Sequence, residues 1–340
     1  MHDIQVCELF AGIGGFRLGL ENASSQFHTV YANEHDQYAA AIYRHHWPNS
    51  NLQEIDVKKV QTQNVPSFDL LVAGFPCQPY SNAGARKGTK DPRGLLYPEI
   101  LRFAKEKQPK LLLLENVPGL LCIEQGGVFK EILWSLHELG YTVEWRILDS
   151  KFFRVPQQRR RVFIIGYLAT FARGGETVFP IPQSGKSYFN KISKRQTTCT
   201  CLDANYPKGA GGGRTLIIQT NMHKNKNKPV LRVNSEVMPT LCSRMGTGGN
   251  NVPMVLRERE SIRRLTPIEC ERLQGFPNNW TKHGLTPTGE TVPISNTQRY
   301  KTLGNAVTTT VISAIGKLLI DFLKKQQFFG YVPECKEASI

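Results

Sequence analysis

The sequence predicts a doubly wound α/β fold, in which helices cover both faces of a mostly parallel sheet, with a second, smaller and irregular β-rich domain. Several short apolar runs have the length of buried strands, and each ends in a glycine or a polar residue: 4–10, 29–32, 68–73 and 111–114. Segments with helical periodicity follow at 95–107 and 129–139. From about residue 170 the chain becomes rich in Gly, Pro, Ser, Thr, Asn and Lys, with only short apolar runs.

Composition indicates the class of partner. The 340 residues carry 43 Lys and Arg against 28 Asp and Glu, a net charge of +15 that favours a polyanion. No apolar run approaches the roughly 18 residues of a membrane-spanning helix, and Met1 is followed by polar residues, so we expect a cytosolic protein. The eight cysteines show no metal-ligand spacing, and we expect free thiols and no metal.

The first two predicted strands end in groups that suit a nucleoside. Gly12, Gly14 and Gly15 follow the first strand and let the backbone approach a ligand. Glu34 ends the second strand, twenty positions after Gly14, where doubly wound folds place an acid on a ribose hydroxyl. Asp56 ends the next candidate strand and suits an adenine amino group. These residues together describe an adenosine pocket.

A candidate nucleophile follows the strand at 68–73. Cys77 lies in a Gly- and Pro-rich loop, and Glu115 ends the next apolar run, so the thiol and the carboxyl group should face one crevice. Such a pair suits covalent addition to an electron-poor heterocycle. A lone cysteine is more often a buried apolar residue, but Pro76 and Pro79 fix the chain around Cys77 in a way that core filling does not require.

Further segments carry charge or turn signals. The Gly-rich basic loop at 82–94 is either a mobile lid or an ordinary solvated loop. Three arginines at 159–161 precede a strand at 162–165. Their side chains are either solvated or bind a phosphate or a carbonyl oxygen. Lysines in the irregular region suit phosphates, although a solvated run is equally consistent. Regular structure resumes at Ser261, and Thr266 is a helix N-cap with Glu269 three residues on. A Gly304–Asn305 turn then leads into a helix at 308–325.

Taken together, these residues resemble the cytosine carbon-5 DNA methyltransferases of bacterial restriction-modification systems, across nearly the whole chain. The motifs that carry the resemblance occur in the family's order: Phe-Ala-Gly-Ile-Gly-Gly, Gly-Phe-Pro-Cys-Gln-Pro, Glu-Asn-Val, Gln-Gln-Arg-Arg-Arg, Arg-Leu-Thr-Pro-Ile-Glu-Cys-Glu-Arg-Leu-Gln-Gly-Phe-Pro and Gly-Asn-Ala-Val. The resemblance implies a Rossmann-like domain that binds S-adenosyl-L-methionine at 1–184 and 292–326. A target-recognition domain with its hinge would occupy 185–291, and a tail 327–340.

The resemblance also implies a mechanism and a set of site residues. The target cytosine leaves the duplex, Cys77 adds to carbon 6, Glu115 contacts ring nitrogen 3, and Arg161 contacts the base carbonyl with Arg159 and Gln157 in support. The methyl donor would become S-adenosyl-L-homocysteine, without a metal. The cofactor pocket would comprise Phe10, Ala11, Gly12, Gly14, Gly15, Glu34, His35, Asp56, Val57, Pro76, Leu96 and Asn305. His35 replaces the large aromatic residue often found near the adenine. Contacts with double-stranded DNA are expected at Ser81, Ala83, Arg93, Thr240, Leu241 and Arg264. Members of this family usually act as monomers in the cytoplasm, so the resemblance implies the same for this chain.

Three alternatives predict different chemistry. A tRNA cytosine methyltransferase would carry a Cys-Phe-Thr signature, which is absent from the sequence. A regulatory DNA-binding subunit would have no need of Cys77, Glu115 and Arg161. A nicotinamide oxidoreductase would account for the glycine turn and Glu34 but not for the net charge of +15 or the Pro-Cys-Gln motif.

Overall fold

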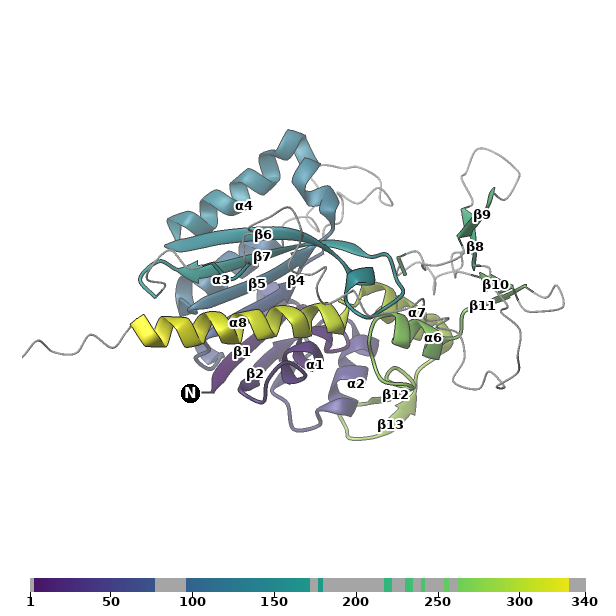
Figure 1. The fold of residues 1–340 in the computed structure, drawn as a ribbon. Coiled ribbons are helices and arrows are strands. Elements are labelled where there is room, and N and C mark those ends of the chain that lie inside the picture. The colour runs from purple at the N-terminus through teal and green to yellow at the C-terminus, as the bar shows by residue number, and fades with distance from the viewer. Residues whose placement is uncertain are drawn as a thin grey trace, which may run out of the picture.

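A seven-stranded sheet forms the centre of the protein, with strand order β3-β2-β1-β4-β5-β7-β6 (Figure 1). The computed structural model describes residues 3–76, 96–171, 177–179, 217–221, 230–234, 240–241, 254–256 and 262–329. Neighbouring strands are parallel from β3 to β5, whereas β7 is antiparallel to both β5 and β6. The strands are β1 (Ile4–Leu9), β2 (Phe27–Asn33), β3 (Leu52–Gln53), β4 (Leu70–Gly74), β5 (Leu111–Asn116), β6 (Tyr141–Asp149) and β7 (Arg160–Leu168).

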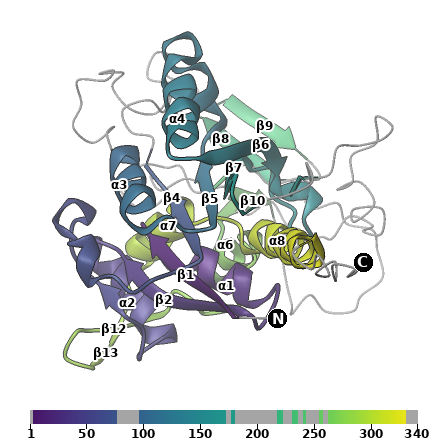
Figure 2. The same ribbon diagram turned by 90° about the vertical axis from the view of Figure 1, so that its left-hand side faces the viewer.

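Helices cover both faces of this sheet, which confirms the predicted doubly wound fold. α1 (Gly15–Glu21) and α8 (Thr309–Phe329) cover one face, and α3 (Tyr97–Lys107) and α4 (Gly127–Glu138) cover the other (Figure 2). Leu111 and Leu113 of β5 belong to the core on the first face, whereas Leu112 and Leu114 belong to the core on the second. Because side chains alternate along a strand, one leucine run supplies both cores, which is why it lacks polar residues. Short 3-10 turns complete this part: η1 (Val57–Lys59), η2 (Thr62–Asn64), η5 (Pro118–Gly126) and η6 (Ser150–Phe152).

The apolar character of α8 corrects one expectation from the sequence. A window within Asn296–Gln326 is long and apolar enough to cross a membrane by length and composition. However, 61% of this window is buried inside the protein. Val311, Ile312, Ile315 and Leu319 of α8 belong to the core beneath the sheet. A long helix that is mostly buried against a sheet can therefore pass a test of length and composition without crossing a bilayer.

A third group of helices packs beside β1 and β2. It contains α2 (Gln37–His46), α6 (Pro267–Leu273), α7 (Asn296–Asn305) and the hairpin of β12 (His283–Leu285) and β13 (Thr291–Pro293). The predicted capping box of α6 is present, since Thr266 and Glu269 each bond the other's backbone N–H. Trp280 Nε1 donates to the carbonyl of Ile13 at 3.0 Å, which ties residues after α6 to the turn before α1. The domain boundary at 291 stays a prediction, but residues between 265 and 291 contact the part of the chain that contains the main sheet.

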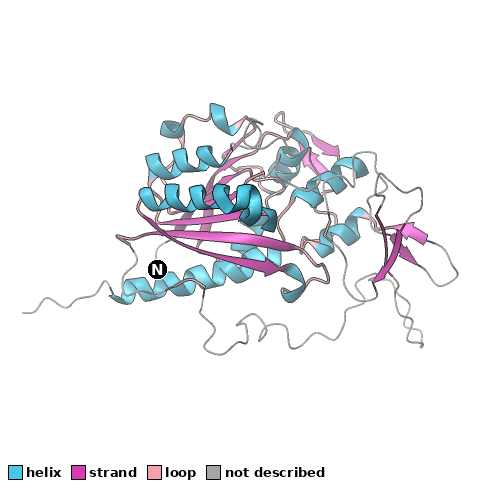
Figure 3. Cartoon of the chain, turned by 90° about the horizontal axis from the view of Figure 1, so that it is seen from above, coloured by secondary structure: helices cyan, strands magenta, loops and turns pink. Residues whose placement is uncertain are grey.

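The irregular region contains a separate antiparallel sheet. Its order is β11-β10-β8-β9, formed by β8 (Ile217–Asn221), β9 (Val230–Asn234), β10 (Met254–Leu256) and β11 (Ile262–Arg264). Figures 1 and 3 show it to one side of the main sheet, beyond α6. Two of the short apolar runs in this region, at 215–218 and 253–256, contribute residues to β8 and β10.

Candidate active site

The sheet topology brings the predicted site residues to one edge. In β1, β2, β4 and β5 the carboxyl ends lie at the same edge because the strands are parallel. β7 runs the opposite way, so its beginning, at Arg160 and Arg161, reaches this edge as well. The reversal of strand order on either side of β1 places a crevice between β1 and β4.

The glycine turn after β1 presents its backbone to open space. Phe10 and Gly12 have φ values of 55° and 57°, in the left-handed region. A Cβ added to Gly12 would meet no atom within 4 Å, and the Gly12 N–H donates to Glu34 Oε2 at 2.8 Å. Gly14 and Gly15 serve packing instead: a Cβ would lie 2.2 Å from Trp47 at the first and 2.7 Å from Val307 at the second. Of these three glycines, Gly12 has the geometry of a ligand cradle.

Glu34 is fixed beside this turn. Its side chain is 7% exposed, and Oε1 accepts the backbone N–H groups of His35 at 2.9 Å and Asp36 at 2.8 Å. The His35 ring is exposed, and its hydrogen bond to Glu34 raises the pKa of the imidazole. Asp56 is exposed and caps η1 by accepting the Lys58 N–H at 3.0 Å. Glu34 thus directly follows β2, whereas Asp56 lies three residues beyond the end of β3.

The other predicted pocket residues differ in how far they are exposed to solvent. Asn305 is exposed at the end of α7, and Leu96 is half-buried at the start of α3. The Val57 side chain is buried in the core, and the Val57 carbonyl accepts a hydrogen bond from Arg102 at 3.0 Å. Ala11 is buried, and its N–H donates to the Asn33 carbonyl at 2.9 Å.

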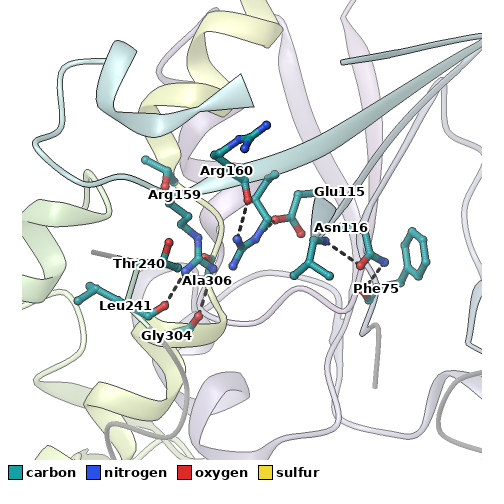
Figure 4. A network of polar contacts seen from close by, with 12 residues as sticks. Phe75, Glu115, Asn116, Arg159, Arg160, Thr240, Leu241, Gly304 and Ala306 are labelled. Atoms are coloured by element: carbon teal, nitrogen blue, oxygen red, sulfur yellow. Dashed lines mark hydrogen bonds and ion pairs between the residues drawn. The ribbon is translucent and has the colours of Figure 1, made fainter. Parts of the chain in front are cut away.

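Glu115 forms a buried pair with Arg161 at the end of β5. Arg161 Nε lies 2.9 Å from Glu115 Oε1, and the Glu115 residue is 8% exposed (Figure 4). Burial raises the pKa of the Glu115 carboxyl group, against the opposing charges of Arg161 and Arg159. The group can therefore hold a proton more readily than an exposed glutamate.

The end of β4 is tied to Glu115 from the other side. Gly74 is in register with Glu115, and a Cβ at Gly74 would lie 3.6 Å from Glu115 Oε2. Asn116 Nδ2 donates to the Phe75 carbonyl at 3.1 Å. The exposed Pro76 therefore starts its loop beside Glu115. Cys77, Ser81, Ala83 and Arg93 lie outside the described residues.

Gln157 and Arg159 form a buried junction rather than an open site. Arg159 donates to the carbonyls of Leu241 at 2.8 Å, Gly304 at 3.1 Å and Ala306 at 2.8 Å. Gln157 donates to the Leu273 carbonyl at 2.8 Å and accepts from the Leu241 N–H at 2.9 Å. Figure 4 shows Arg159 directed at Leu241 and Gly304, whereas Glu115 lies apart from them.

Gln274 is a member of this junction that the sequence analysis did not single out. Its Nε2 donates to the Leu303 carbonyl at 2.9 Å, and its Oε1 accepts from Thr308 Oγ1 at 2.8 Å. In the sequence, the feature that could have identified Gln274 is its position directly before Gly275, the glycine that ends α6. We call Gln157, Arg159 and Gln274 the polar junction.

One expected DNA contact is corrected by this arrangement. The Leu241 side chain is 0% exposed and packs in the core with Leu265 and Leu273, so it does not face DNA. Both of its backbone polar groups are bonded within the polar junction. Thr240 is exposed, with its hydroxyl donating to the Gln158 carbonyl at 2.6 Å, and Arg264 is exposed.

Curated bacterial proteins are similar to this chain over most of its length. The chain is 34% identical over 320 residues to the Type II methyltransferase M.Bsp6I of Bacillus sp. (strain RFL6), covering 92% of this chain and 98% of the relative. It is 34% identical to M.SsoII of Shigella sonnei, covering 94% of this chain and 80% of the relative.

Solved structures show the same fold. The Dnmt2 methyltransferase of S. pombe aligns with a TM-score of 0.65 at 19% identity, covering 95% of this chain and 99% of the other. A putative DNA modification methyltransferase from an E. coli prophage aligns with a TM-score of 0.62 at 21% identity, covering 95% and 100%. The family described as C-5 cytosine-specific DNA methylase matches residues 4–321, so the chain belongs to this family and is a DNA cytosine-5 methyltransferase.

Proposed function

We propose that this enzyme is the modification methyltransferase of a restriction-modification system, and that it methylates carbon 5 of one cytosine within a short sequence of duplex DNA. The buried Glu115–Arg161 pair, at the edge where β4 leads into Cys77, is the observation that carries the proposal. The relatives M.Bsp6I and M.SsoII are Type II methyltransferases of bacteria, which supports this role and a cytoplasmic location. We further propose that the enzyme acts as a monomer.

Cys77 is the proposed nucleophile. Its thiolate forms a bond to carbon 6 of a cytosine that has left the duplex, and the electrons of the 5,6 double bond move toward ring nitrogen 3. Carbon 5 then becomes nucleophilic and receives the methyl group. Loss of the carbon-5 proton restores the double bond and breaks the bond between carbon 6 and sulfur.

Glu115 and Arg161 stabilise the charge that this addition creates. Ring nitrogen 3 is an acceptor, so a protonated Glu115 can donate to it, and the raised pKa of Glu115 favours that form. Arg161 lies against Glu115 and is 17% exposed at its side chain, which leaves it able to contact the neighbouring carbonyl of the ring. Arg159 has its guanidinium on three backbone carbonyls and is a positioning residue in this proposal.

The residues present fit S-adenosyl-L-methionine, whose sulfonium supplies an electrophilic methyl group. Gly12 offers open backbone, and the anchored Glu34 and exposed Asp56 have acceptor oxygens for ribose and adenine hydrogens. Asn305 and Pro76 would border the same crevice. None of these contacts uses a metal ligand set.

The test uses the full chain, unmethylated DNA and S-adenosyl-L-methionine, with modified cytosines mapped by conversion sequencing. We expect complete methylation at carbon 5 within one short motif and none with Cys77→Ala. DNA containing 5-fluorocytosine in that motif should give a covalent complex, because no carbon-5 proton can leave, and Cys77→Ser should give none.

Three outcomes would contradict all or part of the proposal. Methylation of tRNA but not DNA would favour the RNA-directed alternative. DNA binding without any methyl transfer by the wild-type enzyme would favour a regulatory subunit. Methylation at many unrelated sequences would overturn the modification role while leaving the chemistry intact.

A further inference from the structure

The turn between β6 and β7 lies at the same edge as the Glu115–Arg161 pair. β6 ends at Asp149, which pairs with Arg160, and Leu148 pairs with Arg161. Since β6 runs parallel to β5, its end and the residues of the turn project from the edge at which the parallel strands finish. A base that reaches Glu115 would therefore enter at the edge of the sheet where this turn lies.

Two arginines on this turn are exposed. Among the residues that the structure describes, neither Arg154 nor Arg160 forms an ion pair, although both are accessible to solvent. Asp149, the acid beside them, is already engaged: Oδ1 accepts the N–H groups of Arg159 at 3.1 Å and Lys151 at 3.4 Å, and Oδ2 lies 3.9 Å from Lys151 Nζ. The Arg160 side chain extends away from Glu115 in Figure 4, so it is not part of the buried pair.

Arg154 is held in an unfavourable backbone conformation. Its φ is 62°, in the left-handed region where glycine is free of strain and an arginine is not. The neighbours Phe153 and Val155 are 3% and 5% exposed, so their packing fixes the turn and directs Arg154 outward. A strained residue with a charged, exposed side chain indicates use of that side chain, because glycine would relieve the strain.

We infer that Arg154 and Arg160 bind phosphates of the DNA that flanks the extruded cytosine. This inference rests on the proposed function. Guanidinium groups bind phosphate oxygens in a bidentate fashion, and such contacts position the duplex without reading its sequence. The turn therefore contributes to DNA affinity and its salt dependence, and not to the choice of target motif.

The decisive measurement is the salt dependence of DNA binding by the full chain. A fluorescein-labelled duplex of arbitrary sequence is titrated at several NaCl concentrations with wild type and with the double variant Arg154→Gln/Arg160→Gln. Each lost phosphate contact lowers the slope of log K against log [NaCl] by about 0.9, so the double variant should lose about 1.8. If binding is equal at 1 M salt, that slope corresponds to roughly 60-fold weaker binding at 0.1 M.

Lys317→Gln/Lys324→Gln is the matched control. These exposed lysines of α8 lie roughly 12 and 22 Å along the helix from Thr309, toward the opposite edge of the sheet. The same charge is removed, and the slope should stay at the wild-type value. An unchanged slope in the arginine variant, or an equal loss in the lysine variant, would overturn the inference and identify the turn as an ordinary solvated loop.

Single variants at Arg154 separate binding from folding. Arg154→Gly should leave the urea-unfolding midpoint unchanged or raise it while lowering the salt slope, and Arg154→Lys should keep most of the slope. A purely structural arginine would instead lower the midpoint when replaced by glycine. The arginine double variant should methylate the same motif as wild type, but it should need a higher DNA concentration to do so.

These results are independent of the proposed chemistry. If wild type methylates DNA and the arginine double variant keeps its slope, only the phosphate contact fails. If wild type binds DNA with the expected slope difference but transfers no methyl group, the contact stands and the proposed function fails.

Discussion

Glu115 shows how one side chain is prepared for its chemistry. Its strand places it at the edge, its burial favours the protonated form, and Arg161 holds the carboxyl group at 2.9 Å. Neither the burial nor the arginine can replace the other, because burial alone would leave the group free to rotate and the arginine alone would favour the charged form.

We expect Glu115→Gln to lower the single-turnover methylation rate by about 10²–10⁴-fold, the usual contribution of a positioned acid. Glutamine fits the same space and can donate a hydrogen bond, but it cannot transfer a proton to nitrogen 3. Rapid-quench assays with saturating DNA would measure the effect, and DNA affinity should be nearly unchanged. A rate within a few-fold of wild type would show that the acid is dispensable.

At the level of elements, β1 carries a buried acid that the proposed mechanism does not use. Glu8 is 0% exposed, and the hydroxyl of Tyr43 on α2 donates to its Oε2 at 3.1 Å. Burial raises the pKa of Glu8 from 4.5 to about 8, against the opposing charge of Arg17 on α1. The carboxyl group joins β1, α1 and α2 beneath the glycine turn.

The folding stability should therefore fall as the pH rises from about 5 to 8. In this range the folded protein keeps the Glu8 proton and the unfolded chain has lost it, so the unfolded state is favoured progressively. Compared with Glu8→Gln, wild type should lose on the order of 2–4 kcal/mol of unfolding free energy over this interval. Urea unfolding at several pH values measures it, and parallel curves for the two proteins would contradict the assignment.

Elements with a clear apolar period could be predicted, whereas those stabilised by distant polar partners could not. The strands β1, β2, β4, β5 and β7 and the helices α3, α4, α6 and α8 have predicted bounds close to the observed ones, because they bury apolar faces. No helix is predicted at 296–305, because the buried residues of α7 include the polar Arg299 and Thr302. Arg299 bonds Glu271 and Thr281 at 3.0 and 2.9 Å, partners that no local pattern reveals.

For the site, the motifs located Glu115 and Arg161 but not the way in which they meet. Their pairing depends on β7 being antiparallel to β5, which periodicity does not specify. The Thr240–Leu241 motif lies within the predicted target-recognition domain and predicts a DNA contact at Leu241. The structure instead buries the Leu241 side chain in the core with Leu265 and Leu273 and bonds its backbone to the polar junction. The order of motifs thus indicates membership of a site, while the role of each residue depends on three-dimensional contacts.

On the scale of the whole molecule, the polar junction links three parts of the chain. Arg159 connects the start of β7 to Leu241, which lies within the predicted target-recognition domain, and to Gly304 and Ala306 around the exposed Asn305. The net charge of +15 attracts DNA to the molecule as a whole, whereas this junction fixes the position of Leu241 relative to the main sheet.

We expect Arg159→Lys to raise the KM for both DNA and S-adenosyl-L-methionine by about 10-fold, with a smaller change in kcat. Lysine keeps the charge but cannot reach three carbonyls in the plane of a guanidinium, and each ill-satisfied buried carbonyl costs about 1–3 kcal/mol. Steady-state kinetics with each substrate varied would test it. A loss confined to kcat would instead place Arg159 at the reacting base.

The pairing of β7 on both sides has a consequence for how this enzyme can change over time. β5 and β6 together fix the position of Arg161, which pairs with Glu115. The turn that precedes β7 can therefore gain, lose or exchange charged residues without displacing Glu115. DNA affinity and catalysis thus depend on neighbouring but structurally independent segments of the chain. Selection can therefore change how long the enzyme stays bound to a chromosome while its catalytic step stays the same.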